Sequence, residues 1–67
     1  MQRHHYLVYQ YQYREMRRPR VDAVRFDGMR MYDAVDLMPP TVKMFASVIT
    51  NSKREAIKTF RERYLVK

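Results

Sequence analysis

The sequence contains no cysteine and no tryptophan, and its 67 residues include one glycine and three prolines. Without cysteine, disulfide bonds and thiolate metal sites are excluded. Because glycine and proline are scarce and 46% of the residues are hydrophobic, the composition favours a folded unit over a disordered one. We therefore expect a single small basic domain spanning residues 1–67.

Long apolar runs are also missing. No stretch approaches the roughly 18 apolar residues that cross a bilayer, and the first residues, MQRHH, lead into tyrosine and glutamine rather than the apolar core of a secretory signal. We expect no membrane contact and a cytoplasmic location. A core of this size supplies only about 3–5 kcal/mol, so we also expect a homodimer or a standing partner to add stability.

Negative charge is scarce, since 14 Lys and Arg stand against 7 Asp and Glu, a net charge of +7. Residues 1–20 carry five arginines against one glutamate (net +4), and residues 41–67 carry seven basic residues against two glutamates (net +5). Residues 21–40 carry two arginines against four aspartates (net −2). A field of this kind attracts polyanions, of which nucleic acid is the commonest in a cell.

Two segments have the pattern of β-strands. Residues 5–14 (HYLVYQYQYR) alternate between two faces and are rich in aromatic and β-branched residues, which predicts a strand. Residues 15–20 break the alternation at Pro19 and are interpreted as a basic loop. Residues 43–50 (KMFASVIT) are apolar on both sides, which predicts an inner strand of the sheet.

The segment between these strands allows two interpretations. Asp27-Gly28 within VDAVRFDGMRMY is a strong signal for a β-hairpin, which would place Arg25 opposite Arg30. Alternatively, Asp27 caps a short helix that ends before Pro39-Pro40, because apolar residues recur at helical spacing. These are Met31, Tyr32, Val35 and Met38. The hairpin is the favoured interpretation.

The C-terminal segment has the signals of a helix. Ser52 and Glu55 match a capping box, in which each side chain bonds the backbone N–H of the other residue. Apolar residues at three- and four-residue spacing predict a helix from Lys53 to Tyr64. They are Ala56, Ile57, Phe60 and Tyr64. The predicted fold is α+β: a small antiparallel sheet of three to four strands, including the Asp27-Gly28 hairpin, with this helix on one face and the other face open.

Two basic clusters could contact phosphates. Arg54, Lys58 and Arg61 lie at i, i+4 and i+7, on one flank of the predicted helix. The second cluster is the arginine-rich stretch of the loop and consists of Arg14, Arg17, Arg18 and Arg20. Ten of the fourteen basic residues are arginines, whose guanidinium groups bond phosphate through two N–H groups and stack on bases.

Tyrosines supply candidates for base stacking, which is worth about 1–3 kcal/mol per base. Leu7, Tyr9, Tyr11 and Tyr13 share one face of the first strand. This face is the more apolar one, so we expect the helix to cover at least Leu7 and Tyr9. The opposite face, with Tyr6, Gln10 and Gln12, is expected to be exposed. The stacking candidates are Tyr6, Tyr11 and Tyr13.

The sequence has no recognisable catalytic motif. His4-His5 lacks a third ligand for a metal site, and the chain has no glycine-rich phosphate loop or nucleophile elbow. We expect no metal, no cofactor and no enzymatic activity.

Together, these patterns predict a nucleic-acid-binding protein that favours RNA or single strands. The predicted phosphate contacts are Arg14, Arg17, Arg18, Arg20, Arg25, Arg30, Arg54, Lys58 and Arg61. The alternative is a small protein-binding module that presents these cations to an acidic protein surface and regulates or inhibits a larger enzyme or assembly. Accessory subunits and virus-encoded host-takeover factors are often of this type.

Overall fold

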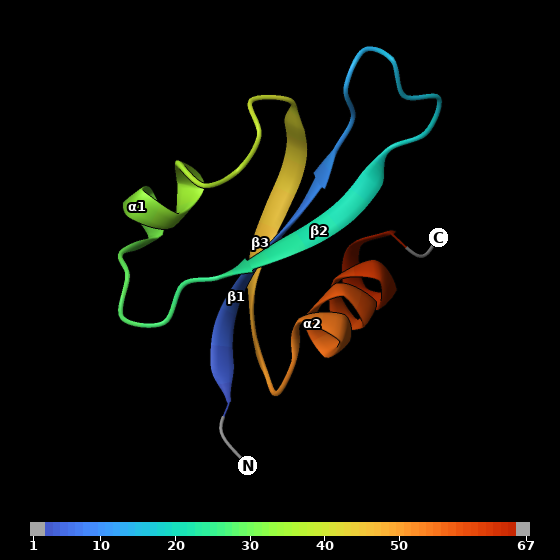
Figure 1. Cartoon of the computed structure of the whole chain (residues 1–67). Coiled ribbons are helices and arrows are strands. Elements are labelled where there is room, and N and C mark those ends of the chain that lie inside the picture. Colours follow the sequence, from blue (N-terminus) through green and yellow to red (C-terminus); the bar gives the residue numbers. More distant parts are fainter. Residues whose placement is uncertain (1–2, 66–67) are drawn as a thin grey trace.

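The computed structural model describes residues 3–65 (Figure 1). The chain forms β1 (His4–Tyr11), β2 (Arg20–Arg25), α1 (Met31–Val35), β3 (Val42–Thr50) and α2 (Lys53–Phe60), in that order. The last helix continues as a wider, π-type turn over Arg61–Leu65. A three-stranded antiparallel sheet with a C-terminal helix confirms the predicted α+β class.

The first strand of the chain is the central strand of the sheet. The strand order is β2-β1-β3, and both pairings are antiparallel. Tyr6 lies opposite Arg25 on β2 and Val48 on β3, and a bulge between Gln10 and Tyr11 shifts the register with β3. The prediction that residues 43–50 form an inner strand is therefore wrong. Only one of its two apolar sides is covered, by α2. On the other side, Phe45 and Ile49 are exposed.

One face of the sheet packs against α2. The buried residues of this cluster are Tyr6, Val8, Ala23, Val48, Ala56 and Phe60. Ala23 on β2 and Ala56 on α2 are small, which lets the helix approach the sheet closely. The expectation that α2 covers Leu7 and Tyr9 and leaves Tyr6 exposed is wrong, because Tyr6 lies under α2 and is only 7% exposed.

The opposite face has a smaller core of its own. Leu7, Phe26 and Ala34 are buried there, with Val24, Val35 and Met38 packed around them. Ala34 belongs to α1, so this short helix covers part of the face that we expected to be open.

The Asp27-Gly28 dipeptide forms a turn but not a β-hairpin. The N–H of Met29 donates to the carbonyl oxygen of Phe26 at 3.0 Å, and Gly28 adopts a left-handed conformation with φ of +71°. Glycine suits this position because it lacks a Cβ. The chain then enters α1 instead of a second strand, and β2 pairs with β1.

The alternative interpretation, a short helix in this segment, is correct in outline. Its cap differs from the one we expected, because α1 begins after Arg30, which makes no capping side-chain hydrogen bond. The carboxylate of Asp27 is occupied elsewhere: it accepts from the backbone N–H of His5 at 2.6 Å and from Arg25 Nε at 2.7 Å. Asp27 therefore ties the start of β1 to the end of β2.

The start of α2 follows its sequence signal in part. Ser52 Oγ accepts from the N–H of Glu55 at 3.2 Å, as the capping box predicts. The Glu55 carboxylate instead accepts from Thr50 Oγ1 at 2.8 Å, which connects the end of β3 to the helix. Along the predicted apolar stripe, Phe60 is fully buried, whereas Tyr64 is 47% exposed and lies with its ring 5.2 Å from that of Phe60.

Candidate nucleic-acid interface

The loop between β1 and β2, residues 12–19, is held by its own hydrogen bonds. Gln12 Nε2 donates to the carbonyl oxygen of Met16 at 3.0 Å, and the N–H of Met16 donates to the carbonyl oxygen of Tyr13 at 3.0 Å. The N–H of Tyr13 also points to the Met16 sulfur at 3.3 Å. We call residues 12–19 the basic loop; these bonds give it a defined backbone from which its arginines project.

The four arginines predicted here are exposed: Arg14, Arg17, Arg18 and Arg20. Arg17, Arg18 and Arg20 line one hollow of about 540 Å³, together with Glu15 and Met16. Within residues 3–65, none of the four makes an ion pair with a carboxylate. The structure therefore brings three of these cations together around one concave site and leaves their charges available.

The three cations predicted on α2 also come together. Arg54, Lys58 and Arg61 line a shallow groove of about 370 Å³ with Ile57 and Glu62. We call these three cations the α2 flank; like those of the basic loop, they make no ion pair in the described part of the chain. Lys53, one residue before Arg54, differs, because its Nζ lies 3.0 Å from Asp22 Oδ1.

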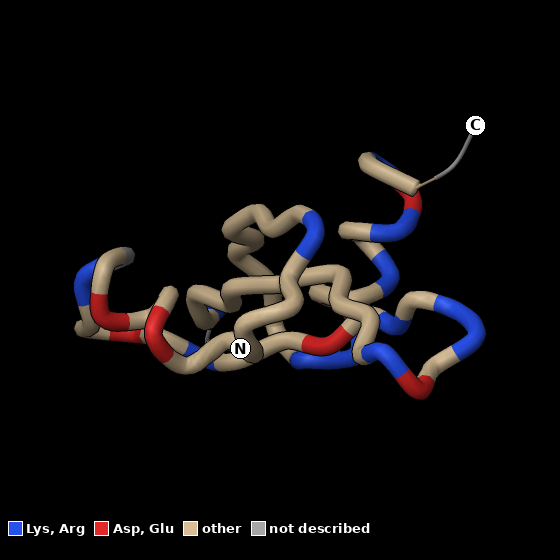
Figure 2. Tube along the Cα trace, turned by 90° about the horizontal axis from the view of Figure 1, so that it is seen from above, with Lys and Arg blue, Asp and Glu red and all other residues tan. Residues whose placement is uncertain are grey.

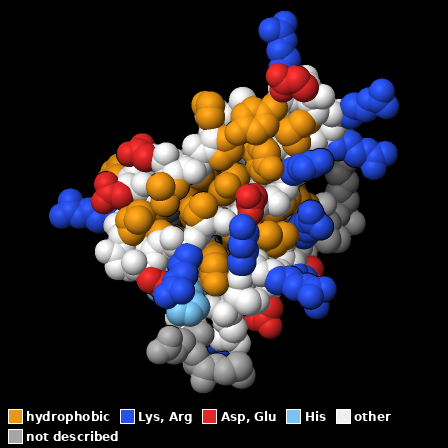
Figure 3. Space-filling model, in the orientation of Figure 1, with side chains coloured by type: hydrophobic (Ala, Val, Ile, Leu, Met, Phe, Trp, Pro, Cys, Tyr) orange, Lys and Arg blue, Asp and Glu red, His pale blue; other side chains and the backbone are white. Residues whose placement is uncertain are grey.

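The basic loop and α2 lie at the same end of the molecule, away from α1 (Figures 1 and 2). Figure 2 shows most basic segments at this end, together with some acidic ones, and further acidic segments at the α1 end. In Figure 3, Lys and Arg side chains extend along one side of the molecule, from the basic loop to α2. The two clusters that are separate in the sequence thus share one side of the fold.

Arg25 and Arg30 are not part of this surface. Arg25 Nε lies 2.7 Å from Asp27 Oδ2, so its charge is matched, and Arg30 is an exposed residue just before α1. The expectation that these two arginines face each other across a hairpin is wrong, because the hairpin does not form. The N–H of His5, with Arg25 and His4, holds the pKa of Asp27 at about 2, below its ordinary value of 3.8.

The tyrosines of β1 form a row of rings that runs from the core to the basic loop. The ring centroids of Tyr9 and Tyr11 are 5.7 Å apart, and those of Tyr11 and Tyr13 are 5.6 Å apart. Tyr9 is buried, Tyr11 is partly buried and Tyr13 is 40% exposed. Burial, followed by the nearby Asp22 carboxylate, raises the pKa of Tyr9. Of the predicted stacking residues, Tyr13 is exposed, Tyr11 is partly accessible and Tyr6 is buried.

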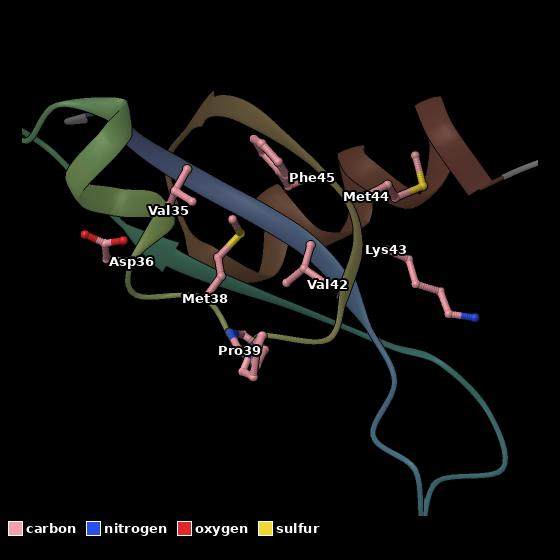
Figure 4. Close-up of a pocket in the computed structure, with 9 residues that line it drawn as sticks. Val35, Asp36, Met38, Pro39, Val42, Lys43, Met44 and Phe45 are labelled. Carbon is pink, nitrogen blue, oxygen red and sulfur yellow. The ribbon is translucent and has the colours of Figure 1, made fainter.

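Sequence reasoning missed a hollow beside β3. It has a volume of about 680 Å³ and lies between β3 and the segment that follows α1. Val35 and Met38 face Val42 and Phe45 across it, whereas Lys43 points away (Figure 4). The sequence signal for this hollow was Pro39-Pro40, which lines it. Consecutive prolines keep a linker extended and prevent it from pairing with the neighbouring strand.

Other kinds of site find no support among residues 3–65. No group of three or more His, Cys, Asp or Glu side chains is placed to hold a metal ion. None of the helices described is long and apolar enough to cross a membrane. Comparison with protein-family models, curated proteins and solved structures gave no significant match.

Proposed function

We propose that this protein binds single-stranded nucleic acid, with RNA preferred, through the basic loop, Arg20 and the α2 flank. The observation that carries the proposal is a set of seven exposed cations that make no ion pair within the described chain and share one end of the fold. They are Arg14, Arg17, Arg18, Arg20, Arg54, Lys58 and Arg61. Cations that serve only the fold would be expected beside carboxylates, as Arg25 and Lys53 are.

The shapes of the two basic sites suit a phosphate backbone. Six of the seven cations line two concave sites, and each side chain can neutralise one phosphate and release its counterions. Because guanidinium groups predominate, bidentate contacts to phosphate oxygens are available at most positions.

Tyr13 gives the proposal its preference for unpaired strands. Its ring is 40% exposed, belongs to the basic loop and contacts the ring of Tyr11. A base can stack on such a ring only when it is not already stacked within a duplex. We therefore assign phosphates to the seven cations and one base to Tyr13.

The salt dependence of binding tests the electrostatic part of this proposal. Fluorescence anisotropy would follow a labelled single-stranded RNA, with single-stranded DNA and duplex RNA of the same sequence as comparisons. If about five phosphates are neutralised, the logarithm of the association constant falls against the logarithm of salt concentration with a slope of roughly −3.5 to −4.5. A slope near zero, or equal affinity for duplex and single strand, contradicts the proposal.

A pair of charge reversals tests the location of the site. Replacing Arg17 and Arg18 together (R17E/R18E) places repulsion in the hollow of the basic loop and should abolish measurable RNA binding. The control is Arg30→Glu with Arg3→Glu, which makes the same change of charge in residues outside the proposed site. If both variants lose affinity equally, net charge governs binding and the proposed site is wrong.

An acidic protein partner would exploit the same cations. Affinity purification with and without nuclease treatment separates the two cases. Recovery of one stoichiometric protein after nuclease treatment, without nucleic acid in the eluate, would favour the protein-binding module over our proposal.

A further inference from the structure

The outer edge of β3 is an unpaired edge of the sheet. β3 pairs with β1 on one side, and β1 is itself completed on its other side by β2. Among residues 3–65, no backbone hydrogen bond other than those to β1 involves residues 42–50. About half of the backbone N–H and C=O groups of this nine-residue strand therefore have no backbone partner among the described residues, as is usual at a sheet edge.

Apart from Lys43 and the bulge beside it at the start of β3, the side chains do not protect this edge. From Met44 to Thr50 the strand has no charged residue, no proline and no glycine, and proteins usually block an exposed edge with charges, proline or bulges. Phe45 is 47% exposed and Ile49 is 56% exposed. Both belong to the face of the sheet that α2 does not cover, and large apolar side chains there are available to a partner.

We propose that two copies of this chain join through their β3 strands, antiparallel, about a two-fold axis at Ser47. A two-fold axis perpendicular to the sheet keeps each residue on the same face in both copies. Opposite residues must point to the same face, and side chains alternate along a strand, so the numbers of two paired residues add to an even total. Centring the axis on Ser47 places Phe45 of one copy opposite Ile49 of the other, twice. With the axis at Ala46 or Val48, Phe45 of one copy would no longer lie opposite Ile49 of the other.

This register is favourable in three respects. Aromatic side chains opposite β-branched ones are among the stabilising cross-strand pairs. No like charges oppose each other between Met44 and Thr50, because the segment has none. The two-fold axis also directs the basic loops of the two copies to opposite ends of a six-stranded sheet, which keeps the two charges of +7 apart. A second copy is therefore the occupant that this edge fits.

The dimer is independent of the proposed function and is tested without nucleic acid. Sedimentation equilibrium on nuclease-treated protein, from micromolar to millimolar concentration, should show the mass rising from 8.3 kDa to twice that value. Association should strengthen between about 0.1 M and about 1 M salt, because salt screens the repulsion between two basic chains. This dependence is opposite in sign to that of RNA binding, so either proposal can fail while the other stands.

In this register Ser47 of one copy lies opposite Ser47 of the other, which allows a sharper test. S47K and S47E each place two like charges opposite each other across the axis and should be monomeric at concentrations at which the parent chain is dimeric. An equimolar mixture of the two variants should restore the dimer, because lysine then lies opposite glutamate. Leu37→Lys is the matched control, since Leu37 is 50% exposed and lies outside β3. Circular dichroism checks that each variant is folded.

The outcomes decide the proposal. A parent chain that stays monomeric at millimolar concentration in high salt overturns it. A dimer that persists in both S47K and S47E, or that is lost equally in Leu37→Lys, places the contact elsewhere and also overturns it. Recovery of the dimer only in the mixture supports both the edge and the register.

Discussion

At one edge of the sheet, β2 carries Arg20, Asp22 and Arg25, follows Pro19 and is connected to α2 by the ion pair between Asp22 and Lys53. At the other edge, β3 has no charge from Met44 to Thr50 and exposes two large apolar side chains. Because charges and proline prevent strand addition, the β2 edge suits ionic ligands and the β3 edge suits another strand. The difference shows how a chain of this size can hold two separate recognition surfaces.

The α2 cluster and the β3 edge should lose very different amounts of stability when an aromatic ring is removed from each. Phe60→Ala removes a fully buried ring from the α2 cluster and should cost about 3–5 kcal/mol, comparable to the whole stability expected at this size. Phe45→Ala removes a half-exposed ring on β3 and should cost the monomer about 1 kcal/mol. Urea denaturation at low protein concentration measures both. Equal losses would show that the β3 side carries as much of the core as the α2 side.

The basic end of the molecule is tested by removing its accessible ring. Tyr13→Ala should weaken binding of single-stranded RNA by about 1–3 kcal/mol, roughly 5- to 150-fold, with little change in the salt slope because no charge is lost. Tyr32→Ala is the control, since Tyr32 lies on α1 and is 86% exposed. If both variants bind like the parent chain, stacking on Tyr13 is not part of the interface.

The acid stability of the fold should depend on Asp27, at the junction of β1 and β2. Because its pKa in the folded chain, about 2, is below the ordinary 3.8, its contribution is complete above the higher value. This contribution is lost as the pH falls toward 2, because the unfolded chain binds the proton first. Asp27→Asn should lower the free energy of unfolding at pH 7 and reduce its pH dependence between 4 and 2. Denaturation at several pH values measures both effects, and an unchanged pH profile would contradict this role.

The sequence was sufficient to predict the elements whose signals are local. The alternation of residues 5–14 predicted β1, and Ser52 with the stripe containing Ala56 and Phe60 predicted α2. In both cases short-range periodicity and burial agree, so tertiary contacts reinforce the local preference. The clustering of Arg54, Lys58 and Arg61 follows from helical spacing in the same way.

Features that depend on long-range pairing could not be predicted from local sequence signals. Asp27-Gly28 indicated a hairpin, yet β2 pairs with β1. The Asp27 side chain bonds His4 and His5, which lie 23 and 22 positions away in the sequence. The face of β1 that meets α2 was also predicted wrongly. The choice depends on the small residues Ala23 and Ala56, which make room for the helix, rather than on which face of β1 is more apolar.

The central place of β1 has a consequence for how the molecule assembles on the ribosome. β1 and β2 are separated by a short loop and can pair early, whereas β3 and α2 come later in the chain. Until residues 42–60 have left the exit tunnel, β1 has no partner on its β3 side, and the ring of Tyr6 lacks the cover of Val48, Ala56 and Phe60. The sheet is therefore completed only after β3 has emerged, and the nascent chain should be sensitive to chaperones until then.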